Sequence, residues 1–408
     1  MLKNIYYKIP PRLKNIAVTV TAFTQEKAKY GSIYLNFLRS LINEQRTGNG
    51  KQQRDLEEFL KYAKMNLLYY RKIKDIHSSP VLTKDDVIDN YDFLKAGKAY
   101  RTLSSSGTTG QELYVPWSKE AYQKEYAFCW YHRSFAGLKR GDRVATIAGH
   151  RIINVLQKHP PFWVYNNWEN QLLFSSFHLS AQNLRYYVGE LNRFKPYLIN
   201  GFPSSIYLIA HHIMENNIKL DFVPKMIVAS SESLLDFQRT VIEKALTCKV
   251  YSWYGNVEQC GHITECEHGK LHIQPRHSFV RILNSNNEDV ADGERGRIVA
   301  TNFLNKCFPL INYDTKDYVT LSKNQSCPCG RPGRIVEDID GRIEDYIVLP
   351  NGRMIGRSGF IFKHAINVRL AQIEQRSVSQ IIIHIQKSRD YTVQDEKIIL
   401  DEARLVFG

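Results

Sequence analysis

The sequence lacks the long hydrophobic runs that a membrane-spanning helix needs. No apolar stretch in its 408 residues reaches the roughly 18 residues that are typical of such a helix. The first residues, MLKNIYYKIPPRLKN, are basic, and they contain neither an apolar segment nor a small-residue cleavage site. We therefore expect no membrane span and a soluble, cytoplasmic protein.

Cysteine is also scarce, and its distribution argues against a disulfide framework. The seven cysteines are odd in number, mostly far apart, and follow no secretory signal. The sequence has no internal repeat and no low-complexity tract. A hydrophobic content of 43% is enough for packed cores, and the length predicts two or more domains.

Acidic residues are too few to balance the basic ones. The chain has 55 Lys and Arg residues against 41 Asp and Glu residues, a formal net charge of +14. This excess favours anionic partners such as nucleotides and phosphorylated substrates. Because the basic residues are dispersed and no zinc-finger or RNA-binding signature is present, nucleic acid is not expected as a partner.

The spacing of apolar residues predicts an α/β fold in two domains. Helical periodicity dominates residues 1–95, a lead-in to a large α/β domain over 1–340, in which short buried strands alternate with amphipathic helices. A β-rich portion follows at 279–321. Residues 341–408 predict a small α+β domain with a helix at 362–374, a strand at 379–386 and a helix at 395–407. Since no further strand follows, we expect this domain to be incomplete.

A loop rich in glycine and hydroxyl groups, TLSSSGTTGQE at 102–112, is the first candidate site. Such a loop lets backbone N–H groups approach phosphates closely, and its flanks predict a turn between two strands. It is not a Walker A loop, because no Gly-Lys-Ser/Thr follows. A plain connector is the alternative. The candidate residues are Ser104, Ser105, Ser106, Gly107, Thr108, Thr109 and Gly110.

Two predicted strand ends carry further candidates for a nucleotide site. Ligands of open α/β sheets bind at the carboxyl ends of strands, where an aromatic ring can pack on a base and a carboxylate can hold Mg²⁺. Ordinary strand ends are the alternative. The candidates are Tyr254, Gly255, Asn256 and Glu258 in YSWYGNVEQCG, and Ser231, Glu232 and Ser233 in VASSES.

Three cysteines and a histidine predict a zinc site. Cys327 and Cys329 lie in a tight CPCG turn, and Cys266 lies upstream in ECEHGKLH with His268 and His272. Four such ligands from two segments suit tetrahedral Zn²⁺. We prefer His272 to His268, which is too close to Cys266 for easy tetrahedral geometry. Unrelated buried thiols are the alternative.

Two charged motifs complete the set of candidates. Asp317 in NYDTKD could accept hydrogen bonds from a ribose diol, and Arg342 in GRIEDYI could pair with a phosphate. Each motif taken singly is more typical of a routine surface loop with a salt bridge.

The order of these motifs (SSSGTTG, SSE, YGNVE, NYDTKD, GRIED) resembles that of the acyl-adenylate-forming superfamily, in its phenylacetate–CoA ligase branch. The likeness covers most of the chain. Residues 160–210 are similar to CapK-type proteins encoded with capsular polysaccharide genes. Zinc-containing members of the branch also have a CPCGR cluster with an upstream Cys and His.

The resemblance implies that ATP and a carboxylic acid form an acyl-AMP, whose acyl group then passes to CoA or an amine. It implies that the 104–110 loop, including Thr108, grips the leaving phosphates and that Glu258 binds Mg²⁺. Residues 231–233 would line the adenine pocket. The remaining roles would be adenine packing by Tyr254, ribose binding by Asp317, and ribose or phosphate binding by Arg342. Glu344 and Asp345 would form the hinge of the small domain.

The sequence also departs from the family pattern. Gln111 stands where a Lys is usual, Lys316 interrupts the usual Arg-Thr-Gly-Asp, and the C-terminal Gly-Lys segment of many members is absent. Two other functions therefore stay open. One is an adenylyltransferase like coenzyme F390 synthetase, and the other is a catalytically idle, zinc-stabilised protein that binds nucleotides or polyanions. Either protein, like a ligase, could form a homodimer.

Overall fold

The protein divides into two compact units, Met1–Gly341 and Arg342–Gly408. The computed structural model describes residues 6, 9–44, 51–105, 113–150, 152–154, 156–342, 347–350, 354–355, 361–362 and 367–407. Within these residues, no helix is both long and apolar enough to cross a membrane.

The large unit begins with the helices that the sequence predicts. The bounds are α2 (Pro11–Lys29), α3 (Ser32–Glu44), α4 (Gln52–Asn66), η1 (Leu68–Tyr70), α5 (Lys84–Asp89) and η2 (Tyr91–Leu94). Helix α5 begins at a capping box: the Thr83 hydroxyl accepts from the Asp86 N–H at 3.2 Å, and the Asp86 carboxylate accepts from the Thr83 N–H at 2.8 Å.

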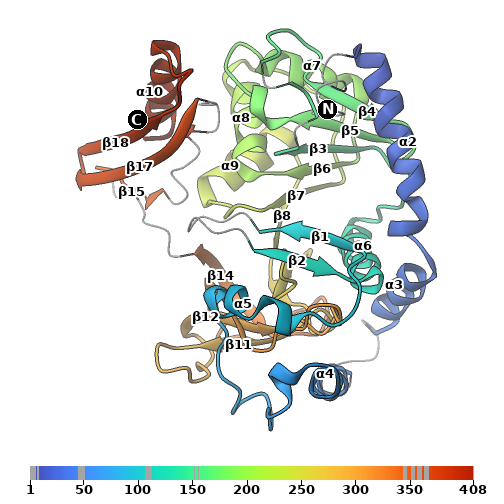
Figure 1. Ribbon diagram of the computed structural model, residues 1–408. Helices are drawn as coiled ribbons and strands as arrows, with labels where there is room; N and C mark the ends of the chain where they lie inside the picture. Colours follow the sequence, from blue (N-terminus) through green and yellow to red (C-terminus); the bar gives the residue numbers. More distant parts are fainter. Residues whose placement is uncertain are drawn as a thin grey trace. The chain divides into compact units, whose positions relative to one another are not determined.

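A twelve-stranded mixed sheet forms the centre of the large unit, in the order β11-β12-β13-β14-β10-β9-β8-β7-β6-β3-β5-β4 (Figure 1). The predicted α/β class is confirmed. Its strands are β3 (Val144–Ala148), β4 (Trp163–Asn166), β5 (Gln171–Ser175), β6 (Leu198–Gly201), β7 (Met226–Ser230), β8 (Val250–Gly255), β9 (His262–Glu265), β10 (Leu271–Ile273), β11 (Phe279–Leu283), β12 (Arg295–Thr301), β13 (Tyr313–Leu321) and β14 (Ile335–Arg342).

The parallel half of this sheet runs from β5 through β3, β6 and β7 to β8. Its crossover helices are those that the amphipathic pattern predicts, and their apolar faces pack in one core with the strands. The remaining helices of the unit are α6 (Lys119–Arg133), η3 (Ser134–Ala136), η4 (Ser176–His178), α7 (Leu184–Phe194), α8 (Pro203–Glu215) and α9 (Asp236–Leu246).

The carboxyl ends of the parallel strands lie at one edge of the sheet. Ile147 of β3 pairs with Gly201 of β6, Gly201 pairs with Ala229 of β7, and Ser230 pairs with Trp253 of β8. The segments that follow β7 and β8 carry the predicted candidates 231–233 and 254–258. In open α/β sheets this edge is where ligands bind.

Gly201 is required at this edge because the backbone of β3 comes too close for a side chain. A Cβ atom at position 201 would lie 2.0 Å from the carbonyl oxygen of Ile147. That oxygen accepts a hydrogen bond from the Phe202 N–H at 3.1 Å, so it cannot move away without breaking the bond.

We expect Gly201→Ala to lower the free energy of unfolding by about 3 kcal/mol or more, because the added methyl group meets backbone rather than a flexible side chain. Gly189→Ala is the matched control. Gly189 is exposed on α7, where a Cβ would meet no atom within 4 Å, so this change should stabilise the protein by about 0.5–1 kcal/mol. Urea unfolding of both variants measures the difference, and equal stabilities would contradict the packing argument.

Beyond β8 the sheet becomes antiparallel. Strand β9 pairs with β8 and β10, β10 pairs with β14, and β12 lies between β11 and β13. The inner faces of these strands share a hydrophobic core with α4 and with the hairpin of β1 (Arg101–Ser104) and β2 (Tyr114–Trp117). Strand β8 is therefore the boundary between the two halves of the sheet.

In the small unit, one sequence prediction is wrong. Residues 362–374, predicted as a helix, include the first part of β17 (Val368–Ser377), which pairs with β18 (Gln380–Lys387) in an antiparallel ladder. Cross-strand pairs such as Ile373 with Ile383 outweigh the helix-like spacing of the segment. The strand at 379–386 and the helix at 395–407 are confirmed as β18 and α10 (Val393–Phe407). The other strands are β15 (Ile347–Val348) and β16 (Met354–Ile355).

Candidate functional site

The hydroxyl-rich segment lies between two paired strands, as predicted. Strands β1 (Arg101–Ser104) and β2 (Tyr114–Trp117) are antiparallel (Figure 1). Ser105 extends the pairing: its N–H donates to the Leu113 carbonyl at 2.9 Å, and its hydroxyl accepts from the Leu113 N–H at 3.3 Å. Ser105 is therefore a structural residue at the base of the loop. The predicted residues Ser106, Gly107, Thr108, Thr109 and Gly110 lie outside the described residues.

The hairpin is attached to the loop that follows β8. The Trp117 indole N–H donates to the Val257 carbonyl at 2.8 Å, next to Glu258. Asn305 holds the same end of β2, because its amide donates to the Pro116 carbonyl at 2.9 Å and its carbonyl accepts from the Ser118 N–H at 3.2 Å. Strand β2 is thus bonded directly to the loop that carries Glu258.

The loop after β8 is closed by Asn256. Its side-chain carbonyl accepts from the Cys260 N–H at 2.8 Å, and its amide donates to the Cys260 carbonyl at 2.6 Å. Inside this loop, Glu258 is 3% exposed and accepts a hydrogen bond from the Tyr313 hydroxyl at 3.2 Å. The Asn302 amide donates to the Glu258 carbonyl at 2.8 Å. Glu258 is therefore held from both its backbone and its side chain.

Tyr254 and Asp317 meet although they lie on different strands. The Tyr254 hydroxyl, at the end of β8, donates to Asp317 Oδ2 on β13 at 2.7 Å. Burial and then the negative charge of Asp317 raise the pKa of Tyr254 well above its usual value of 10. Tyr254 stays protonated, so it remains a donor and fixes one oxygen of the Asp317 carboxylate.

A bulge in β13 places Asp317. The pairing with β12 shifts between Arg297 and Val299, and Lys316 has a left-handed φ of 60°. The Thr315 hydroxyl donates to the Ile298 carbonyl at 3.0 Å and accepts from the Asp317 N–H at 3.1 Å. Lys316 thus adopts a positive φ, which glycine adopts most readily. The family that the sequence resembles usually has Gly at this position.

The other residues predicted to bind the nucleotide differ in where they lie and in whether their side chains are described. Glu232 Oε2 accepts from the Ser204 N–H at 3.2 Å, so its carboxylate lies at the N-terminus of α8, where a negative charge is favourable. Ser231, with a left-handed φ of 68°, and Ser233 are exposed beside it. Arg342 is the last residue of β14, and its side chain lies outside the described residues, as do Glu344 and Asp345.

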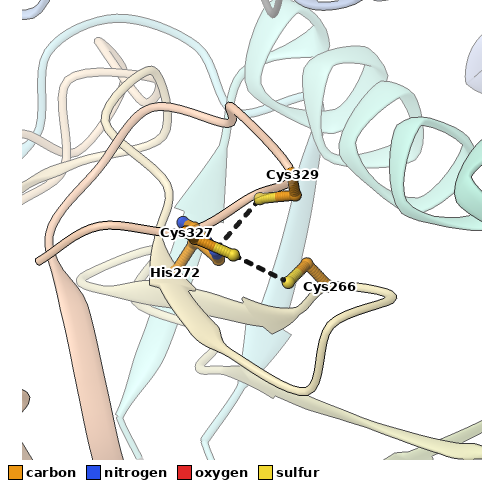
Figure 2. Close-up of side chains that lie close together, drawn as sticks. All are labelled: Cys266, His272, Cys327 and Cys329. Atoms are coloured by element: carbon orange, nitrogen blue, oxygen red, sulfur yellow. Dashed lines mark hydrogen bonds between the residues drawn. The ribbon is translucent and has the colours of Figure 1, made fainter. Parts of the chain in front are cut away.

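Four predicted zinc ligands lie together in the antiparallel half of the sheet (Figure 2). Cys266 follows β9 and His272 is on β10, so the tight β9–β10 turn brings them close. Cys327 and Cys329 come from the loop between β13 and β14. His268 is not a member of this group among the described residues.

The distances in this cluster fit a tetrahedral ion. Cys266 Sγ lies 3.7 Å from Cys327 Sγ, and Cys329 Sγ lies 3.4 Å from His272 Nε2. Zinc bonds of about 2.3 Å to sulfur and about 2.1 Å to nitrogen imply about 3.8 Å between two sulfurs and about 3.6 Å between sulfur and nitrogen. Burial raises the pKa of the Cys266 thiol to about 12 and lowers the pKa of His272 to about 4. The residues present therefore fit Zn²⁺, whose charge would stabilise the thiolates.

Several supporting residues had no role in the sequence predictions. Tyr313 lies within the NYDTKD motif, four residues before Asp317. Its place in that motif is the sequence signal that could have identified it as part of the site. Trp117 ends the predicted strand ELYVPWS, but its partner Val257 is 140 residues away in the sequence. No local pattern connects such residues.

Comparisons with known proteins first define the class. In solved structures of 2-hydroxyisobutyryl-CoA ligase, an open conformation with 2-HIB-AMP and CoA has a TM-score of 0.54 and 16% identity, and the match covers 88% of this chain and 85% of that chain. The post-adenylation state with R3-HIB-AMP has a TM-score of 0.55 and 15% identity, covering 99% and 86%. The fold is therefore that of the adenylate-forming ligases.

Sequence relatives make the placement more specific. Protein CapK of Staphylococcus aureus is 27% identical over 411 residues, 96% of this chain and 89% of CapK. Phenylacetate-coenzyme A ligase of Escherichia coli (strain K12) is 23% identical over 294 residues, 69% of this chain and 64% of that protein. No family model matches the chain. The chain is thus similar to CapK over nearly its whole length and to phenylacetate-coenzyme A ligase over about two thirds of it, and it has the fold of the CoA ligases.

Proposed function

We propose that the chain is an ATP-dependent, AMP-forming carboxylate ligase. The observation that carries this proposal is that Tyr254, at the end of β8, is bonded to Asp317 of β13, and that the loop after β8 holds the buried Glu258 and is bonded to strand β2. A ligand at this edge would meet a metal-binding carboxylate, an aromatic ring and a diol acceptor together. The similarity to acyl-CoA ligases agrees with that set.

The residues have separate tasks in this mechanism. The hydroxyl-rich loop and Arg342 bind the phosphates and ribose, while Tyr254 and Asp317 orient the nucleoside. The carboxylate of the acid attacks the α-phosphorus of ATP, and the bond to the β-phosphate breaks to release pyrophosphate and leave acyl-AMP. Catalysis of this kind depends on positioning and charge neutralisation rather than on a protein nucleophile.

We propose that the protein binds two kinds of metal ion in this function. Glu258 would hold Mg²⁺, which supplies positive charge to the phosphates when bound. The Cys266–His272–Cys327–Cys329 cluster would hold a structural Zn²⁺, since four protein ligands leave no open position for substrate. That cluster ties the β9–β10 hairpin to the β13–β14 loop.

The acceptor of the acyl group is CoA or an amine. The resemblance of residues 160–210 to CapK-type proteins favours an amine on a surface-polysaccharide precursor, and the similarity to phenylacetate-coenzyme A ligase favours CoA. A pyrophosphate-release screen over carboxylic acids, with CoA or amino sugars as acceptors, tests the proposal. AMP as the final product supports a ligase, whereas AMP retained on the product indicates an adenylyltransferase. Absence of turnover, with polyanion binding that weakens as salt rises, indicates a binding protein.

Asp317→Asn tests the nucleoside part of the site. The change keeps the shape of the side chain but weakens its ability to accept from a ribose hydroxyl, so the KM for ATP should rise about 10-fold, equivalent to about 1.4 kcal/mol. The wild-type protein should also discriminate against 2′,3′-dideoxy-ATP, and the variant should discriminate less. An unchanged preference for the diol would contradict the assigned role of Asp317.

A further inference from the structure

A second group of metal-type side chains lies beside the Glu258 loop, apart from the cysteine cluster. It consists of Glu125 on α6, His262 at the start of β9, and His277 after β10. One potential ligand atom of each residue lies within 4.8 Å of those of the other two. His277 Nε2 is 3.1 Å from Glu125 Oε2, and the two imidazole rings stack at 4.5 Å.

The group contains several buried polar atoms that lack a hydrogen-bond partner in the described part of the chain. These are both ring nitrogens of His262, Nδ1 of His277 and Oε1 of Gln259. The three residues are at most 1% exposed. A buried polar atom without a partner costs about 1–3 kcal/mol, so this many in one place indicates a missing ligand.

We propose that Glu125, His262 and His277 form a second metal site, for Zn²⁺ or a similar transition-metal ion. Two imidazoles and one carboxylate are a donor set of zinc sites that keep a coordination position open. Gln259 supports the carboxylate from outside, because its amide donates to Glu125 Oε2 at 2.9 Å. The ion would use the imidazole nitrogens that otherwise have no partner.

The side chains are chemically suited to a transition-metal ion. Imidazole nitrogens and a carboxylate oxygen bind such an ion when the imidazole is neutral and the carboxylate is ionised.

Metal binding requires a small adjustment of the side chains. Bonds of about 2.0–2.1 Å at the tetrahedral angle place ligand atoms about 3.3 Å apart, so no separation between two ligand atoms must shorten by more than about 1.5 Å. Rotation of the His262 ring can supply this without loss of a hydrogen bond, since neither of its nitrogens has one. Phe128 and Trp253 pack against the same ring and exclude water.

The cluster of Glu125, His262 and His277 lies next to the proposed nucleotide site. His262 pairs with Gly255 across β8 and β9, and its Nδ1 lies 3.6 Å from where a Cβ of residue 255 would be. Gln259, which contacts Glu125, is the neighbour of Glu258 in sequence. A bound ion would therefore hold the Glu258 loop against α6. The inference concerns metal binding, and it stands whether or not the chain is a ligase.

Titration of the metal-free full chain with Co²⁺ and Zn²⁺ tests the proposal. We expect two equivalents to bind, one with thiolate-to-cobalt charge-transfer absorption and one without it. His262→Gln/His277→Gln should lose only the equivalent without thiolate absorption. Cys327→Ser/Cys329→Ser should lose only the other. His178→Gln, a buried histidine outside both clusters, is the matched control and should keep both.

If His262→Gln/His277→Gln does not fold, its loss of metal does not test the site. Glu125→Gln keeps a side chain of nearly the same size and is therefore the second test. It should weaken the equivalent without thiolate absorption at least 10-fold and leave the thiolate band unchanged, which also reports an intact fold. A single equivalent in the wild-type protein, carried entirely by thiolates, would overturn the proposal. So would two unchanged equivalents in His262→Gln/His277→Gln.

Discussion

The Glu258→Gln variant is expected to release pyrophosphate at least about 100-fold more slowly than the wild-type chain with the same acid and ATP, because it loses the negative charge that holds Mg²⁺. Glutamine keeps an oxygen that can accept the Tyr313 hydroxyl, so the loop should stay folded. Raising the Mg²⁺ concentration should restore part of the rate if the lost step is metal binding. Initial rates across a Mg²⁺ series measure both effects.

Glu58→Gln provides the control for this experiment. Glu58 is exposed on α4, where it pairs with Arg54, and its side chain is 62% exposed. Its removal should leave the rate and the melting temperature nearly unchanged, since such surface pairs contribute about 0–1 kcal/mol. If Glu258→Gln turned over at the wild-type rate, the assignment of Glu258 as the magnesium ligand would be wrong.

Removal of the cysteine pair should have the largest effect on stability. We expect Cys327→Ser/Cys329→Ser to lose the thiolate-bound zinc and on the order of 5 kcal/mol of unfolding free energy, a part of the about 10–16 kcal/mol that structural zinc contributes in small peptides. The loss follows because the β13–β14 loop is no longer tied to the β9–β10 hairpin. Elemental analysis and denaturant unfolding measure zinc content and stability together.

Cys248→Ser is the matched control for the zinc experiment. Cys248 is a free thiol outside the cluster, so its replacement should change neither the zinc content nor the stability appreciably. A strong chelator should destabilise the wild-type protein at least as much as the double substitution does, because it removes the thiolate-bound zinc as well as any ion held by Glu125, His262 and His277. A wild-type chain that contains no metal and is as stable as the double variant would contradict the zinc assignment.

The sequence predicted most of the fold because its signals are local. Amphipathic spacing is sufficient to locate α7, α8 and α9, and short β-branched runs locate β6, β7 and β8. Residues 362–374 show the limit of this reasoning. The same spacing of apolar residues fits a helix, but pairing with the isoleucine-rich β18 makes the segment begin β17.

The candidate site was predictable to the extent that its residues lie in short motifs. Tyr254, Asn256 and Glu258 follow one strand, and the structure gives two of them partners that no motif contains: Tyr313 for Glu258 and Asp317 for Tyr254. Their roles toward ATP stay predictions. The sequence motifs give no role to His262 and His277, whose buried Nδ1 atoms, together with Nε2 of His262, lack a hydrogen-bond partner among the described residues. Burial and pairing are properties of the folded chain, and sequence spacing does not report them.

The twelve-stranded sheet has a thermodynamic consequence, because β8 belongs by backbone hydrogen bonds to both of its halves. Neither half can separate without breaking a ladder in the middle of the sheet, so residues 1–341 should melt in one cooperative transition. Nucleotide at the end of β8 and zinc at the β9–β10 turn would then raise the same melting temperature, each by mass action on a shared native state.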